Sequence, residues 1–159
     1  MLVKNLLAVI SNDQESFKQD ITNHIESTLS DLTYADFDIE ANSAHYYECD
    51  GLSIELDSVD FNTDNLSVIS IDGDNIKLSV EMTFSIEASA DFSLSTEDSV
   101  DGDTVALAGT SETETVEFSS NVEINITYYE DEQQYDIDEI TITDLPKTID
   151  FGELEPDYD

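Results

Sequence analysis

The sequence predicts an α+β fold, in which one or two N-terminal helices pack on a mostly antiparallel sheet of five to seven strands, forming two layers. Apolar residues recur every three or four positions up to about Asp31 and every second position after it, the periods of an amphipathic helix and a half-buried strand. In addition, 39% of the 159 residues are hydrophobic, which a disordered acidic chain would lack. We therefore expect one domain over residues 1–144, helical in 1–33 and β-rich in 36–144, followed by an acidic tail.

The helical region is expected to begin with a short helix and to continue as a longer one from Asn12 to Asp31. Ser11 or Asn12 can cap this second helix, because each is followed three residues later by a Gln or Glu that completes a capping box. Spacings of three and four residues then give the helix one apolar stripe. The stripe consists of Phe17, Ile21, Ile25, Leu29 and Leu32. The short first helix has similar spacing at Leu2, Leu6, Leu7 and Ile10.

Two long strands are expected at the centre of the sheet. Between Lys77 and Ser95 the even-numbered residues are apolar and the odd-numbered ones polar, so one face is core and the other faces water. The segment from Val116 to Tyr128 repeats this design with its acids outward. Shorter strands are expected within residues 37–41, 52–61, 68–71 and 135–143.

The sequence also predicts the connections between these strands. Residues 72–75, with the sequence Asp-Gly-Asp-Asn, are typical of a tight hairpin before the first long strand. Residues 129–134 join the last two strands, and a slip in the alternation between Ile137 and Ile140 predicts a β-bulge. The segment 96–112 is rich in Ser, Thr, Gly and Asp, and we expect it to be a loop.

The C-terminal residues 145–159 are predicted to form an acidic tail. Pro146 and Pro156 interrupt regular structure near its two ends. Ile149, Phe151 and Leu154 are the side chains through which part of this tail could still dock on the domain.

The charge of the chain restricts its partners. It has 39 Asp and Glu against 4 Lys and no Arg, a formal net charge of -35. Bare nucleic acid and anionic membrane surfaces would repel such a protein. No apolar run approaches the length of a membrane span, and the N-terminal apolar run is too short for a signal peptide. We therefore expect the protein in the bacterial cytoplasm, which is the host cytoplasm if a phage encodes it. The single cysteine, Cys49, excludes an internal disulfide.

No catalytic residue, metal or cofactor is expected. The carboxylates fall mostly at water-facing strand positions or in turns, which lack the burial that shifts the pKa of a catalytic acid. The Asp-Gly-Asp segments at 72–74 and 101–103 do not continue as a twelve-residue calcium loop and are typical of turns. His24, His45 and Cys49 lack the paired spacing of a zinc site.

The acidic surface is the strongest candidate for a function. Outward carboxylates on strands and on one side of a helix can take the place of nucleic-acid phosphates and bind the Lys and Arg residues of a basic, nucleic-acid-binding protein. This hypothesis describes a DNA-mimic inhibitor or modulator, encoded by a phage or mobile element and directed at a defence nuclease. The expected partner-binding acids are Glu81, Glu87, Asp91, Glu117 and Glu123 on the long strands, and Asp13, Asp20, Glu26 and Asp31 on the helix.

The alternative hypothesis is an accessory, regulatory or antitoxin-like domain that binds one specific protein. Its acidity would then serve solubility or salt adaptation, and its interface would have an apolar centre. The exposed aromatic pair Tyr46 and Tyr47 is the candidate for that interface, since Tyr is enriched where proteins meet. A strand with one of these tyrosines turned inward is an equally good interpretation of the same residues.

Four segments carry a resemblance to a known group of proteins. They are Ser70-Ile71-Asp72-Gly73-Asp74, Val80 to Ser85 with Ala90-Asp91-Phe92-Ser93, Val122 to Ile126, and Ile137 to Ile142. In this order they resemble the C-terminal region of bacterial proteins that have an N-terminal PIN-like nuclease domain, over residues 36 to 144. The nuclease domain itself has no room before Asp36, so no catalytic residue carries over. The resemblance implies an accessory α+β domain from a bacterial defence or toxin module.

Overall fold

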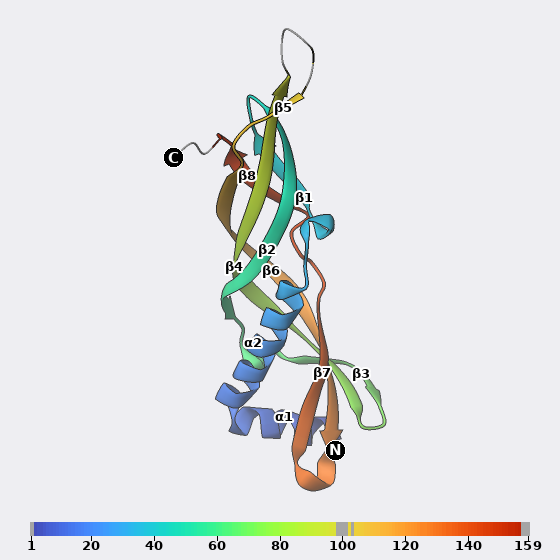
Figure 1. Cartoon of the computed structure of the whole chain (residues 1–159). Coiled ribbons are helices and arrows are strands. Elements are labelled where there is room, and N and C mark those ends of the chain that lie inside the picture. Colours follow the sequence, from blue (N-terminus) through green and yellow to red (C-terminus); the bar gives the residue numbers. More distant parts are fainter. Residues whose placement is uncertain (1, 98–101, 103, 157–159) are drawn as a thin grey trace. The chain divides into compact units, whose positions relative to one another are not determined.

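A computed structural model describes residues 2–97, 102 and 104–156 of the chain. The described residues form two α-helices, α1 (Leu2–Asn12) and α2 (Gln14–Ser30), and eight strands (Figure 1). The strands are β1 (Asp38–Asn42), β2 (Tyr46–Asp60), β3 (Ser67–Asp72), β4 (Asn75–Glu97), β5 (Thr104–Ala106), β6 (Thr110–Tyr129), β7 (Gln134–Ile142) and β8 (Thr148–Glu153). Three single-turn 3-10 helices lie between them, η1 (Tyr34–Asp36), η2 (Thr63–Asn65) and η3 (Glu130–Glu132).

The strands of the described ranges pair into a mostly antiparallel six-stranded sheet and a separate two-stranded one. The large sheet has the order β2-β4-β6-β7, with β3 and β5 also pairing with β4, and β1 pairs with β8 in parallel. The predicted α+β class and antiparallel sheet are therefore confirmed. The two-layer description is too simple, because β2, β4 and β6 have 15, 23 and 20 residues and make a larger sheet than the usual short strands would.

Contacts along the chain group these elements into two compact units. Unit 1 contains Met1–Leu29, Leu56–Ser85 and Glu117–Leu145, and unit 2 contains Ser30–Glu55, Ile86–Val116 and Pro146–Asp159. The division falls within the long strands, so β4 and β6 each contribute residues to both units.

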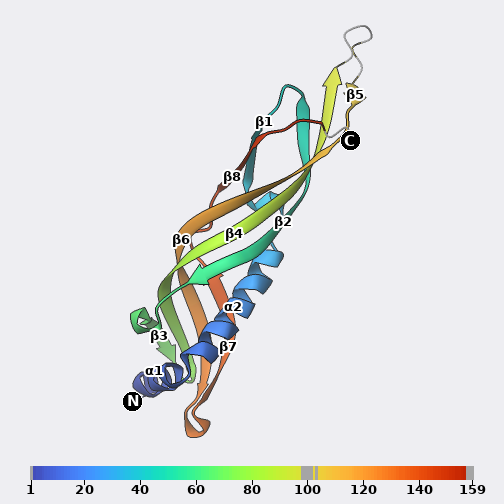
Figure 2. The same cartoon turned by 90° about the vertical axis from the view of Figure 1, so that its left-hand side faces the viewer.

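Unit 1 buries the apolar stripe of α2. The residues Phe17, Ile21, Ile25 and Leu29 of α2 are fully buried, as predicted. Phe17 packs edge-on against Phe61 and Tyr135, with ring centroids 6.3 and 6.0 Å apart, which fixes α2 beside β7 (Figures 1 and 2).

The ends of α2 differ from the prediction, because the helix begins at Gln14 rather than Asn12 and ends at Ser30 rather than Asp31, which leaves Leu32 of the predicted stripe beyond the helix and half-buried. The Asp13 carboxylate, rather than Ser11 or Asn12, accepts the backbone N–H of Ser16 at 3.2 Å. The reason is that α1 continues through Asn12, so the break between the helices falls at Asp13 and leaves that residue in the capping position.

The predicted hairpin and bulge of unit 1 are both present. Asp72 pairs with Asn75 across a two-residue loop, and Gly73 has a φ of 59° there, the left-handed conformation that glycine adopts most easily. On β7, Asn125 pairs with Glu139 and Ile126 with Ile137, so Asp138 is the extra residue of the bulge.

Unit 2 has its own core, to which the expected C-terminal tail contributes. Ile149, Phe151 and Leu154 are buried, and the Phe151 ring packs edge-on against Phe92 with centroids 5.5 Å apart. Residues 148–153 of the predicted tail therefore form strand β8, whose parallel pairing with β1 places these apolar side chains inward. Residues 157–159 of that tail lie outside the described residues.

The expected loop 96–112 is also partly strand. Ser95 pairs with Ala106, which makes β4 and β5 a hairpin, and β6 begins at Thr110. The prediction failed here because β5 has only three residues and residues 110–115 of β6 include no apolar residue, so no apolar alternation marks these strands. Residues 98–101 and 103 of this segment lie outside the described residues.

Candidate partner-binding surfaces

The water-facing side of the unit 1 sheet carries three of the predicted partner-binding acids. Glu81 on β4 and Glu117 on β6 are exposed, and Glu123 on β6 is half-buried. Two side-chain contacts fix how β4 and β6 face each other: Thr83 Oγ1 lies 3.3 Å from Ser119 Oγ, and the Thr127 hydroxyl lies 3.1 Å from the Asn75 amide oxygen. Both contacts belong to a single antiparallel register.

That register interleaves carboxylates with neutral polar side chains. It places Asn121 opposite Glu81 and Ser79 opposite Glu123. Between β6 and β7 the same rule holds, because Glu123 pairs with Thr141 and Glu139 with Asn125. Like charges directly opposite each other destabilise a sheet, so this arrangement lets many acids share one face at little cost.

In unit 2 this interleaving holds around Asp91 but not around Glu87, because the β2–β4 register that sets Asp57 beside Ser85 and Gly51 beside Asp91 places Glu55 opposite Glu87. Glu87 and Asp91 are both exposed on β4. The Ser111 hydroxyl donates to Asp91 Oδ1 at 2.5 Å, and the Ser93 hydroxyl donates to Asp50. Asp91 and Asp50 thus each have a hydroxyl neighbour and an exposed outer side, on which a cation from another molecule can bind.

The predicted helix acids lie along α2 and directly before and after it. Asp13 caps α2, Asp20 and Glu26 lie exposed along α2, and Asp31 follows the helix and belongs to unit 2. Asp20 and Asp13 lie close to Tyr135. Burial, followed by the negative charges of these two carboxylates, raises the pKa of Tyr135 to about 12.

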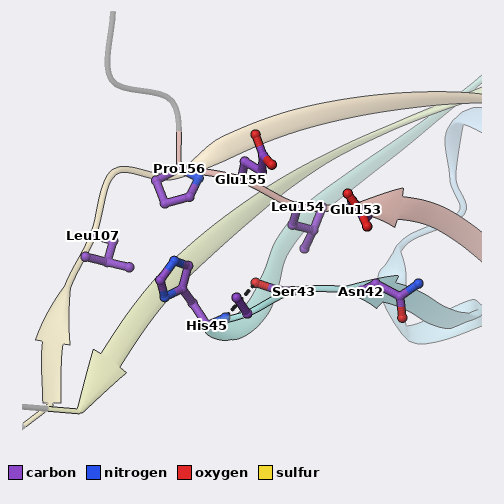
Figure 3. Close-up of a pocket in the computed structure, with 9 residues that line it drawn as sticks. Asn42, Ser43, His45, Leu107, Glu153, Leu154, Glu155 and Pro156 are labelled. Carbon is purple, nitrogen blue, oxygen red and sulfur yellow. Dashed lines mark hydrogen bonds between the residues drawn. The ribbon is translucent and has the colours of Figure 1, made fainter.

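The predicted aromatic pair lies in unit 2 and directly follows His45, which lines an open hollow of about 670 Å³. Tyr46 is 64% exposed, whereas the Tyr47 hydroxyl donates to the Ala41 carbonyl at 3.1 Å and its ring packs against Phe92. Tyr47 is therefore held in place by these contacts, whereas Tyr46 is the more exposed of the two. Figure 3 shows the residues around the hollow, from the β1–β2 turn, the segment after β5 and the end of β8: Asn42, Ser43, His45, Leu107, Glu153, Leu154, Glu155 and Pro156.

The sequence analysis missed an apolar surface on β3 in unit 1. All six residues of this strand are exposed, and Val68, Ile69 and Ile71 expose 37%, 49% and 52% of their surface. A signal was present in the sequence, because the run from Asn65 to Ile71 contains no charged residue although 27% of the chain is charged.

Among the described residues, no three His, Cys, Asp or Glu side chains are placed to share a metal ion. His24 lies in unit 1, whereas His45 and Cys49 lie in unit 2, where burial raises the pKa of the Cys49 thiol. The Asp residues at 101 and 103 lie outside the described residues. Neither helix in the described ranges combines the length and the apolar character needed to cross a bilayer.

Comparison with known proteins gives no match: no family model, curated protein or solved structure is similar to this chain. The resemblance to the accessory region of PIN-like-domain proteins therefore stays a prediction.

Proposed function

We propose that this chain is a non-catalytic binding protein, which uses the carboxylates on its strand faces to bind a basic, nucleic-acid-binding protein in place of nucleic acid. The observation that carries the proposal is the interleaving described above. Across the strands, Glu81 faces Asn121 and Asp91 accepts from the Ser111 hydroxyl, so their cross-strand neighbours are neutral, while Lys18 lines the same hollow as Glu81. With 39 acids and 4 Lys, 35 carboxylates would lack a cation of the chain's own even if every Lys formed an ion pair.

Electrostatics gives the proposed mechanism. Lys and Arg side chains of the partner pair with the exposed carboxylates and release counterions from both surfaces, which drives association at low salt. The acids on one strand are sparser than phosphates. Glu117 and Glu123 are separated by about 20 Å along β6, whereas phosphates follow one another every 3.4 Å or so along each DNA strand. The proposed mimicry is therefore one of charge density over a surface, not a copy of each phosphate position.

The biological setting belongs to the same proposal. A phage or mobile element would encode the protein in order to inhibit or modulate a defence nuclease in the bacterial cytoplasm. The resemblance of residues 36–144 to accessory regions of bacterial defence and toxin proteins supports this setting.

The test compares two variants that each lose three negative charges. The first is Glu81→Gln, Glu117→Gln and Glu123→Gln on the sheet, and its matched control is Glu130→Gln, Asp131→Asn and Glu132→Gln in η3. Binding to a basic, duplex-DNA-binding protein is measured by calorimetry over a range of salt concentrations. We expect the sheet variant to lose affinity and to reduce the slope of log K against log salt by about 0.9 per lost ion pair, with a smaller effect of the control. Equal effects of both variants would refute a specific binding face.

The exposed Tyr46 favours a second candidate function, the accessory, regulatory or antitoxin-like protein-binding domain. Tyr46 is 64% exposed and lines a small open hollow of unit 2 with Ser43, Ala44, His45 and Thr96, an arrangement suited to an aromatic anchor. If this candidate is right, Tyr46→Ser abolishes partner binding, the sheet-acid variant retains it, and binding changes little with salt. The reverse pattern supports binding through the carboxylates.

A further inference from the structure

Strand β3 offers an open, apolar edge in an otherwise acidic protein. It pairs with β4 on one side, and no other described strand pairs with it. Figure 1 shows the β3–β4 hairpin separated from α1, α2 and β7. An exposed sheet edge presents unpaired backbone N–H and C=O groups, which can accept a further strand.

The side chains of β3 continue the apolar face of the sheet. Val68 pairs with Leu78 and Ile71 with Ile76, and both β4 partners are fully buried. Paired residues project to the same side of a sheet, so Val68 and Ile71 extend the core face to a place where, among the described residues, they stay 37% and 52% exposed. Ile69 has no partner in the ladder and marks a bulge.

The hairpin geometry also identifies the free backbone groups. In a two-residue hairpin the pair that closes the turn, Asp72 and Asn75, is hydrogen-bonded, and the next pair is not. The N–H and C=O of Ile71 therefore point away from β4, toward the open edge. A strand added there would bond to Ile71 and cover its side chain.

The charge of the chain decides between the possible occupants. A second copy would bring together two chains that each have a net charge of -35, and a six-residue strand of about 20 Å is too short for the interface of roughly 1,600 Å² typical of a stable dimer. A cationic segment is instead attracted, because the uncharged run is bordered by Asp64 on one side and by Asp72 and Asp74 on the other. We propose that the β3 edge binds an extended segment of a partner protein as an added strand, with alternating apolar and Lys or Arg residues.

This inference does not depend on the carboxylate face being a binding surface. The added strand is held by backbone hydrogen bonds and apolar contacts, and its basic residues only supplement them. If substitution of Glu81, Glu117 and Glu123 had no effect on partner binding, strand addition at β3 could still occur. If no strand binds at β3, the proposed binding through the carboxylates is unaffected.

The test uses the full chain and a capped hexapeptide, Lys-Val-Lys-Ile-Lys-Val. The first control peptide is the same sequence with alternate backbone nitrogens methylated, which keeps charge and side chains but removes strand hydrogen bonds. The second replaces Lys by Glu. Two-dimensional amide NMR should show shifts at residues 67–72 with the first peptide alone, together with slower hydrogen exchange of the Ile71 amide. Equal shifts with the methylated peptide, or an unchanged Ile71 exchange rate, would overturn the proposal.

A pair of variants tests whether the peptide binds at the β3 edge. Ile71→Lys places a positive charge on the β3 edge and should abolish the shifts at 67–72. Val105→Lys, the matched control, makes the same change at an exposed apolar position of β5 and should preserve them. The amide spectrum of each variant verifies its fold. Shifts that survive in Ile71→Lys, or β3 signals that depend on protein concentration without any peptide, would exclude the proposed occupant.

Discussion

The interleaving of acids with neutral residues makes one charge substitution especially informative. In Asn121→Asp the new side chain has nearly the same shape as the old one. Residue 121 is exposed on β6, opposite Glu81. The backbone carbonyl of Asn121 still accepts the N–H of Thr143 at 3.1 Å, so only a charge is added. Two carboxylates roughly 5 Å apart repel each other by about 0.8 kcal/mol in water. Screening reduces this to about 0.5 kcal/mol near 0.1 M salt and to below about 0.2 kcal/mol near 1 M salt.

The assay is urea unfolding at these two salt concentrations. We expect the variant to lose about 0.5 kcal/mol of unfolding free energy at the lower concentration and most of that loss to disappear at the higher one. Asn125→Asp is the matched control, because the shared register places Lys77 on one side of it and Glu139 on the other, so attraction offsets repulsion. The reasoning is refuted if Asn121→Asp destabilises equally at both concentrations, or if Asn125→Asp destabilises as much.

Three further substitutions test the packing and the buried groups. Tyr128→Phe should leave the unfolding free energy unchanged or raise it by about 1 kcal/mol, because the fully buried hydroxyl of Tyr128 has no hydrogen-bond partner among the described residues; chemical denaturation that shows a loss above about 1 kcal/mol would contradict this. Tyr135 has a folded-state pKa of about 12 against a usual 10, so the unfolded chain releases this proton first and the free energy of unfolding should fall between about pH 10 and 12. Unfolding of Tyr135→Phe, measured over the same pH range, should lack this contribution to the fall. A pH profile identical to that of the parent would contradict the expectation. Gly109→Ala would place a Cβ 2.8 Å from the backbone oxygen of Phe92, so thermal unfolding should show a loss of about 1–3 kcal/mol, and a stability equal to that of the parent would show that the backbone can shift freely.

The elements in which apolar residues recur at regular spacing could be predicted from the sequence. The stripe of α2 and the alternation along β4 each involve many residues in a row, and both are present as expected. The β7 bulge was visible for the same reason, since one extra residue shifts the alternation between Ile137 and Ile140.

The parts that depend on pairing between distant segments could not be predicted. Strand β8 is only six residues long, and its partner β1 lies more than one hundred residues earlier, so no local signal indicates the parallel pair. The two prolines near the ends of this segment favoured a tail. Strand β5 has three residues and no apolar alternation, which made it indistinguishable from a loop.

The candidate site was predictable in part. Alternation identified Glu81 and Glu117 as outward, but only the β4–β6 register shows that hydroxyl and amide side chains separate the acids. The helix acids were grouped by sequence, yet Asp31 falls in the other unit. The apolar edge of β3 was missed because alternation predicts that a strand exists and does not predict which elements cover it.

The central claim is that the carboxylates of this chain replace nucleic-acid phosphates on a basic partner. The most direct measurement is competition: a fluorescent DNA duplex is bound to a basic DNA-binding protein, and the chain is added at several salt concentrations. We expect the chain to release the duplex at low salt, and the logarithm of its own affinity for the DNA-binding protein to fall steeply and linearly with log salt. Failure to release the duplex at about 50 mM salt, or an affinity that does not change with salt, would contradict it.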